Sequence, residues 1–212
     1  MTPKSLHYET LANTIVKNLA KRRMDAYYCK TAEEAKELAL SFIPAESTVS
    51  FGGSMTLEES GILTALREKK DITLIDRATA SSPEETKKMY HDALSSDYYF
   101  MSTNAITSDG ELVNIDGTGN RVAALIYGPE NVIVVAGMNK VAANVDEALS
   151  RVHNTATPMN CQRLNKKTPC STTGVCSDCL SPDCICNQVV ITRRSGIEGR
   201  IKVILVGEEL GY

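Results

Sequence analysis

The chain has 212 residues, of which 42% are hydrophobic and 23% are charged, so it can bury the core of one sizeable globular domain. A net charge of −3 and an aromatic content of 5% argue against a nucleic-acid-binding surface, which needs a basic face with interleaved aromatic side chains. No stretch is apolar enough to span a bilayer and the first residues lack a signal-peptide pattern, so we expect a cytoplasmic protein without a membrane partner.

Helical and strand patterns alternate from the first residues onward. Apolar spacing predicts helices over 8–19, 32–42, 55–69, 81–94, 119–128 and 144–164. Thr31 and Ser82 are expected N-caps, since each precedes glutamates in the first helical turn. Short apolar runs predict strands over 25–29, 47–53, 71–77, 97–107, 111–116, 131–141, 188–194 and 200–212.

This alternation predicts an α/β fold: a mostly parallel, Rossmann-like sheet with helices on both faces. The turn at 108–110 adds a β-hairpin between two of the strands. We expect one domain over 1–212, with a cysteine-rich loop at 169–187.

Two glycine turns follow strands and enter helices, where a backbone can approach an anion closely. The first contains Gly52, Gly53, Ser54 and Thr56. The second is the GTGNR segment at 117–121, in which Arg121 could hold a carboxylate or phosphate with two hydrogen bonds. Tight turns with ordinary helix caps are the alternative for both segments.

The polar run over 102–121 carries more hydrogen-bonding side chains than a structural hairpin needs, which favours a pocket. Asn114 and Asp116 share one strand face because side chains alternate along a strand. Lys140 follows the strand at 131–141 and either contacts an anionic substrate or lies in a solvated loop.

Five of the seven cysteines crowd into the loop, with a C-x2-C pair at Cys176 and Cys179. A reduced compartment favours a metal site over disulfides or a redox-active thiol patch, although all three remain open. The expected ligands are Cys170, Cys176, Cys179 and Cys186, with Cys184 as the alternate for Cys186. Zinc and an iron–sulfur cluster both accept four thiolates, and the spacing does not separate them.

The two remaining cysteines and the histidines are assigned no site. Cys29 is expected to be buried in a strand, and Cys161 to pack near the loop, with a role as a further ligand as the alternative. His7, His91 and His153 fall in helical patterns with polar neighbours and are expected to be surface or boundary residues rather than ligands.

Four segments together resemble the lactate-utilisation (LUD) domain family: FGGSMTLEESG, STNAITSDGELVNIDGTGNRVAALIYGP, VIVVAGMNKV and RIKVILVGEELGY. The resemblance covers nearly the whole chain and implies a fold like that of CoA-transferases and ribose-5-phosphate isomerases. It also implies a component of a multi-protein iron–sulfur system that oxidises lactate to pyruvate. The partners would then be a small anionic metabolite and other lactate-utilisation subunits. Assembly into a homo-oligomer stays an open alternative.

Carried over by position, the resemblance implies binding roles for residues in the glycine turns and the polar run, and it adds Asn139 beside Lys140. The implied substrate-binding residues are Gly52, Gly53, Ser54, Thr56, Asn104, Thr107, Asn114, Asp116, Gly117, Thr118, Gly119, Asn120, Arg121 and Lys140.

Three functions remain in competition. The first is an oxidoreductase component for lactate or a similar 2-hydroxy acid. The second is a CoA-transferase or sugar-phosphate isomerase that uses Glu111 as catalytic nucleophile or base. The third is a non-catalytic regulatory subunit that binds a metabolite.

Overall fold

The computed structural model describes residues 2–212, and within them the central sheet has six strands in the order β1-β10-β7-β4-β2-β3. Every pairing in this sheet is parallel, which confirms the predicted α/β class. Its strands are β1 (Asp25–Cys29), β2 (Thr48–Phe51), β3 (Thr73–Ile75), β4 (Tyr98–Met101), β7 (Asn131–Gly137) and β10 (Ile201–Val206). The carboxyl ends of all six strands therefore lie along one edge.

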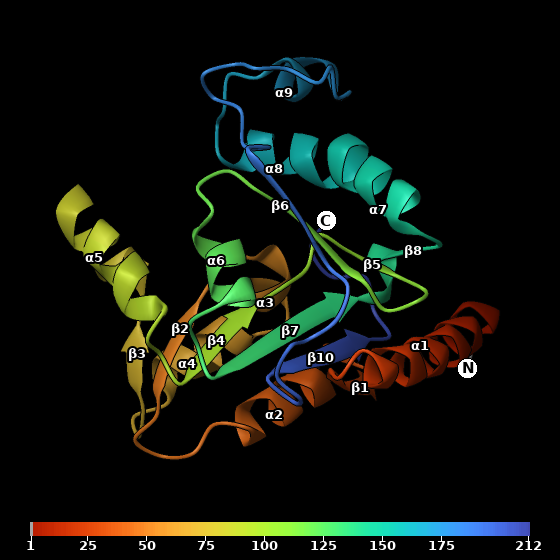
Figure 1. Cartoon of the computed structure of the whole chain (residues 1–212), viewed down its shortest axis with the longest axis vertical. Helices are drawn as coiled ribbons and strands as arrows, with labels where there is room; N and C mark the ends of the chain where they lie inside the picture. Colours follow the sequence, from red (N-terminus) through yellow and green to blue (C-terminus); the bar gives the residue numbers. More distant parts are fainter. Residues whose placement is uncertain (1) are drawn as a thin grey trace.

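Helices cover both faces of the central sheet (Figure 1). One core contains apolar side chains of α1 (Pro3–Lys21) and α6 (Asn120–Ile126), and the other contains those of α2 (Ala32–Ser41) and α4 (Ile62–Glu68). Strand β10 contributes alternate residues to the two cores, as the two-residue period of a strand requires.

The helix boundaries follow local capping chemistry. Thr31 caps α2 by accepting a hydrogen bond from the backbone N–H of Glu34, and Ser82 caps α5 (Pro83–Ala93) through Glu85, as predicted. The single helix expected over 55–69 is instead two helices, α3 (Met55–Glu59) and α4. Gly61 separates them with a φ of 73°, a left-handed conformation that glycine adopts without steric cost.

A second sheet of four strands has the order β8-β5-β6-β9. Its members are β5 (Ala105–Thr107), β6 (Leu112–Asp116), β8 (Val141–Ala142) and β9 (Gln188–Thr192). The strand expected over 97–107 is therefore divided: β4 belongs to the central sheet and β5 to the second one. The segment between them, residues 102–104, crosses from one sheet to the other at the carboxyl edge.

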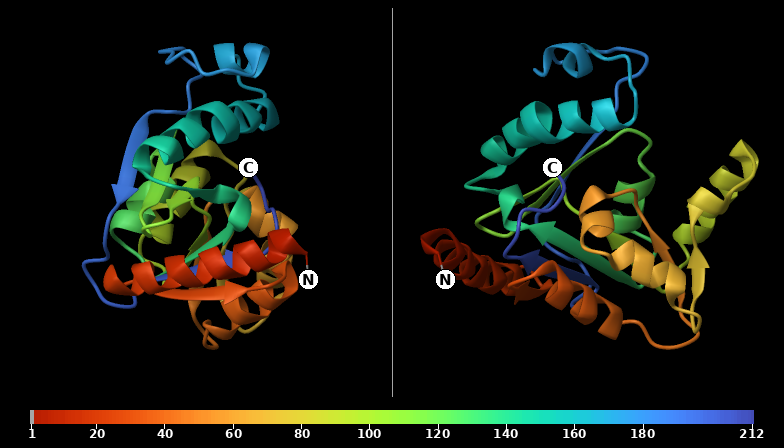
Figure 2. Two further views of the ribbon diagram at one scale, coloured as in Figure 1. Left: turned by 90° about the vertical axis from the view of Figure 1, so that its right-hand side faces the viewer. Right: turned by 180° about the vertical axis from the view of Figure 1, so that it is seen from behind.

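Helices α7 (Val145–Arg151) and α8 (Thr157–Arg163) form one continuous rod with a π-helical segment, η3 (Val152–Ala156), between them. Pro158 has no N–H to donate to the preceding turn, which accounts for the wider turn before it. The rod lies above the central sheet, and the loop that contains α9 (Pro169–Thr173) lies above the rod (Figure 2). No helix within residues 2–212 has the length and apolar character needed to cross a membrane.

Candidate functional site

A cavity of about 390 Å³ lies at the carboxyl ends of the central strands. Gly53 follows β2, Arg77 follows β3, Ser102 follows β4 and Lys140 follows β7, and all four line the cavity. Thr157, Asn160 and Arg163 cover it from the helical rod, and Cys184 and Ile185 from the cysteine loop. Open parallel sheets bind ligands at this edge, and the volume lies in the range of small-molecule pockets.

Most of the predicted binding residues meet in this cavity. Its walls include Gly53, Ser54, Asn104, Asp116, Gly117, Thr118, Asn120, Arg121 and Lys140. The other predicted residues lie outside the lining: Gly52, Thr56, Thr107, Asn114 and Gly119. Thr56 and Asn114 are nevertheless close behind it, because Thr56 contacts Ser102 and Asn114 contacts Arg121.

Arg121 organises the polar run rather than reaching toward a ligand. Its two Nη atoms donate to the side-chain oxygens of Asn104 and Asn114 and to the carbonyl oxygens of Ser102 and Ile115. Its Nε lies 3.3 Å from Oδ2 of Asp116. All five N–H groups of the guanidinium therefore face protein acceptors. None is left to donate the predicted pair of hydrogen bonds to a ligand carboxylate.

Asp116 has a second role in the same wall. Its Oδ1 accepts hydrogen bonds from the backbone N–H groups of Thr118 at 3.1 Å and Gly119 at 2.8 Å. These bonds fix the glycine turn before α6, as an aspartate in a turn is expected to do. Asp116 thus supports both the turn and Arg121, which explains why the sequence carries these residues so close together.

Arg77 is the guanidinium that faces the cavity without a protein acceptor among residues 2–212, and the neighbouring Asp76 carboxylate is paired with Arg67 instead. It begins the short helix η1 (Arg77–Thr79), which Asp76 caps by accepting from Ala78 N at 2.9 Å. Its guanidinium stacks over the Tyr90 ring at 5.7 Å and lies against Gly53, where any Cβ would collide with it. Gly53 thus leaves room for Arg77 to reach the cavity. The glycine turn in the sequence did not indicate this role.

Lys140 is the most deeply buried cation of the site, with a relative exposure of 4%. It ends the short helix η2 (Met138–Lys140), and its Nζ donates to Oγ of Ser102 at 3.1 Å. Burial, together with the positive charges of Arg151 and Arg121, lowers the pKa of Lys140 to about 7. A solvated loop lysine is therefore excluded.

The charges around the cavity are strongly unbalanced. Basic side chains in its lining are Arg77, Arg121, Lys140, Arg163 and Lys166, whereas Asp116 is the one acidic side chain among the described lining residues. Asp116 is already paired with Arg121, and Lys166 lies 3.9 Å from Asp183, so Arg77, Arg163 and the protonated form of Lys140 give the cavity its positive potential. An anionic ligand fits this environment, and a cationic one does not.

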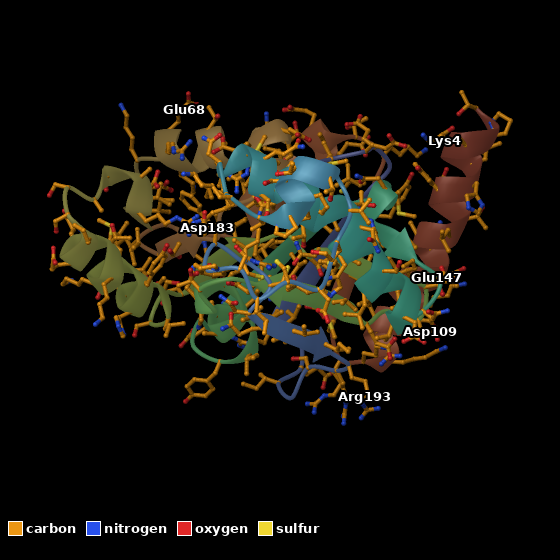
Figure 3. The ribbon with its side chains drawn as sticks, turned by 90° about the horizontal axis from the view of Figure 1, so that it is seen from above. Lys4, Glu68, Asp109, Glu147, Asp183 and Arg193 are labelled. Carbon is orange, nitrogen blue, oxygen red and sulfur yellow. The ribbon has the colours of Figure 1, made fainter. Side chains whose placement is uncertain are left out.

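Glu111 lies at the far end of the β5–β6 hairpin, outside the cavity lining. Its Oε2 accepts from the Thr107 hydroxyl at 3.0 Å and its Oε1 pairs with Arg22 Nη2 at 3.2 Å. Figure 3 labels Asp109, in the same hairpin turn, on the opposite side of the view from Asp183, in the cysteine loop beside the cavity. The structure therefore gives Glu111 and Thr107 a role in holding the hairpin to α1.

The predicted thiol ligands do not converge on one point. Sγ of Cys170 lies 3.8 Å from Sγ of Cys161, and Sγ of Cys186 lies 3.6 Å from the Thr157 hydroxyl. Sγ of Cys176 lies 3.6 Å from Nδ1 of His153, so this half-buried histidine, expected to be a surface or boundary residue, contacts the loop. All seven cysteines are free, and within residues 2–212 no three His, Cys, Asp or Glu side chains are arranged to hold a metal. Zinc and an iron–sulfur cluster at this loop remain predictions.

Several lining residues were missed by the sequence reasoning: Arg77, Tyr90, Arg163, Lys166 and Tyr212. Arg77 had a signal, because it is the last residue of the strand predicted over 71–77 and so had to lie at the carboxyl edge. Tyr212 had none. Asn139 holds the C-terminal segment by accepting from Leu210 N at 3.1 Å and donating to Gly211 O at 3.2 Å. The buried Tyr212 hydroxyl has no hydrogen-bond partner among the described residues.

Comparisons with known proteins agree with this architecture. The family model of the LUD domain matches residues 12–206. A DUF162 family protein from Deinococcus radiodurans has a similar structure, with a TM-score of 0.52 at 14% identity, covering 94% of this chain and 98% of that chain. No curated protein matches the sequence.

Two further solved structures align with only about half of the chain. Ribose 5-phosphate isomerase A from Neisseria gonorrhoeae has a TM-score of 0.34 at 15% identity, covering 55% of this chain and 56% of that one. The eIF2B delta protein from Chaetomium thermophilum has a TM-score of 0.33 at 22% identity, covering 50% and 46%. At these levels neither likeness indicates a shared activity.

Proposed function

Because the chain belongs to the LUD domain family, which is associated with lactate utilisation, we propose that it binds a small carboxylate in the cavity and serves in the oxidation of lactate, or a similar 2-hydroxy acid, to pyruvate. Its partners in this proposal are the other subunits of a multi-protein lactate-utilisation system in the cytoplasm. The chain contributes the site that holds the acid.

The observation that carries the proposal is the unpaired Arg77 guanidinium at the cavity wall. A guanidinium binds a carboxylate through two parallel hydrogen bonds, and Arg77 has its donors free to do so. The Tyr90 ring and the glycine backbone at 53 hold the guanidinium in place, so little side-chain freedom is lost when a ligand binds.

The remaining cavity residues suit a short hydroxy or oxo acid. Ser54 and Asn120 supply neutral donors and acceptors for a hydroxyl or carbonyl group beside the carboxylate. The cavity is larger than a three-carbon acid, so a second reactant has room beside it.

The transferase or isomerase hypothesis relied on Glu111, and that carboxylate lies outside the cavity and is paired with Arg22. No observation at the site favours this alternative. The cationic lining would also attract a phosphate, so the experiment must separate the two anions.

Calorimetric titration tests the proposal with L-lactate, D-lactate, pyruvate, lactamide, inorganic phosphate and ribose 5-phosphate. Lactate or pyruvate should bind and uncharged lactamide should not. Arg77→Gln should weaken binding by about tenfold or more, the loss of about 1.4 kcal/mol. The matched control is Arg194→Gln, an exposed arginine outside the cavity, which should bind as the unmodified chain does. Binding of ribose 5-phosphate without any binding of lactate or pyruvate would contradict the proposal.

A further inference from the structure

Lys140 lies deeper than the other cations of the cavity and, among the described residues, pairs with no carboxylate. Its Nζ has a single hydrogen-bond partner among the described residues, the Ser102 hydroxyl. Oγ of Ser102 in turn lies 3.3 Å from Oγ1 of Thr56, so the amine sits on a small neutral network. The charged groups that face it are Arg121 and Arg151, which repel a proton, and Glu59, which attracts one more weakly.

The neighbouring arginines cannot turn toward the amine to share a ligand with it. Arg121 is fully used by its own acceptors, and Arg151 donates to the carbonyl oxygens of Asn139 at 3.1 Å and Asn104 at 2.7 Å. Both are therefore fixed positive charges, and they favour the neutral form of a buried lysine. A neutral amine is a nucleophile, whereas an ammonium group is not.

We propose that Lys140 is a covalent carbonyl-binding residue, and that it condenses with the carbonyl group of a 2-oxo acid, pyruvate first of all, to form a reversible imine in the cavity. This inference rests on the proposed function, because it takes the carboxylate site at Arg77 as the group that delivers the acid. It narrows the ligand class from small anions to acids with a carbonyl group next to the carboxylate.

The step balances without an electron acceptor. The lone pair of Nζ attacks the carbonyl carbon, and the carbonyl oxygen receives a proton, which gives a carbinolamine. Loss of this oxygen as water removes both amine protons and leaves a carbon–nitrogen double bond. The hydrogen bond to Ser102 uses an N–H of the amine, so the nitrogen lone pair stays free for the attack. A 2-hydroxy acid has no ketone carbonyl and cannot form the imine. Imine formation therefore distinguishes the oxidised form of the substrate from the reduced form.

The amine is available at neutral pH because the pKa of Lys140 is lowered to about 7. About half of the Lys140 side chains are then neutral at pH 7, whereas a lysine at the ordinary value of 10.5 is neutral in about one molecule in three thousand. Selectivity for Lys140 over the surface lysines follows from this difference.

Reduction with borohydride tests the inference, because it converts an imine into a stable secondary amine. The full chain is incubated with pyruvate or L-lactate, reduced and examined by intact mass and peptide mapping. We expect one adduct, at Lys140, with pyruvate and none with lactate. Lys140→Met should abolish it, and the exposed Lys88→Met on α5 should retain it. The adduct yield should rise as the pH increases through about 7.

Calorimetry on the same samples keeps the two proposals separate. Pyruvate that binds without an adduct, or with adducts spread evenly over many lysines, overturns the imine and leaves the carboxylate site in place. Absence of binding by both pyruvate and lactate overturns the proposed function itself. Circular dichroism of Lys140→Met shows whether this variant keeps the fold, and Arg77→Gln, which retains the amine, should lower the adduct yield at limiting pyruvate.

Discussion

Arg121 and Asp116 form an ion pair within the cavity wall, with 3.3 Å between Nε and Oδ2 and side-chain exposures of 13% and 8%. Asp116 reaches Arg121 from the end of β6, and Arg121 comes from the first turn of α6. The pair therefore fixes the glycine turn between these two elements from both sides.

Removal of the guanidinium should destabilise the chain strongly. Arg121→Met takes away the partner of a buried carboxylate and removes one donor from each of four protein acceptors, so we expect a loss of about 3–5 kcal/mol in the free energy of unfolding. Urea denaturation measures it. Lys88→Met breaks an exposed pair with Asp92 and should change stability little. An equal effect of both variants would mean that the pair in the wall is not structural.

A methyl group at position 53 should affect binding more than stability. In Gly53→Ala the new Cβ meets the end of the Arg77 side chain, which is flexible and can move away, so the fold tolerates it. Displacement of Arg77 should weaken lactate or pyruvate binding by about tenfold, roughly the contribution of one charge-assisted hydrogen bond. Gly196→Ala is the matched control, since its Cβ would enter open space. Unchanged affinity in Gly53→Ala would remove Arg77 from the site.

Lys140 should make stability depend on pH in the alkaline range. Its pKa is lowered from 10.5 to about 7, so between these values the unfolded chain binds a proton that the folded chain does not. The free energy of unfolding therefore rises with pH across this window, by up to about 1.4 kcal/mol per pH unit. Below pH 7 the folded chain bears the whole cost of burying the protonated amine. The difference in unfolding free energy between the natural chain and Lys140→Met, measured from pH 6 to 10, should show this slope. A flat difference would mean that Lys140 titrates near its ordinary value.

Metal analysis tests the prediction for the cysteine loop. After anaerobic purification, a thiolate-bound centre should appear as zinc, or as iron with acid-labile sulfide, and it should be lost in Cys170→Ser. Cys29→Ala provides the control, because Cys29 lies in β1 within the core on the α2 side of the sheet. Metal-free protein in which every thiol titrates would contradict the prediction.

The sequence predicted the central fold because its strands and helices carry strong local signals. Ser82 followed by Pro83 starts a helix in any context, and β7 and β10 are continuous apolar runs that need a sheet covered on both faces. The second sheet was not predicted. Residues 97–107 have an extended pattern throughout, and only the tertiary structure decides that the chain changes sheets at residues 102–104.

The sequence predicted where the site lies better than it predicted what each residue does there. Residue types at strand ends located the cavity, because the carboxyl edge is common to all parallel strands. The role of Arg121 depends on which acceptors surround it, and these come from Asn104, Asn114 and the β6 backbone after folding. The free Arg77 could be recognised only once the absence of an acceptor was visible.

The continuous rod from Val145 to Arg163 has a mechanical consequence. Arg151, within its first half, is fastened to the carbonyls of Asn104 and Asn139 below, while Arg163, at its end, overhangs the cavity. These two hydrogen bonds tie the rod to the segment between the sheets and to η2, so contacts made by its first half position Arg163 over the cavity. Beyond the rod, Ile185 packs against the backbone of Gly117, where a Cβ would lie within 3.2 Å of it. A larger residue at 117 would therefore push this part of the cysteine loop away from the cavity wall.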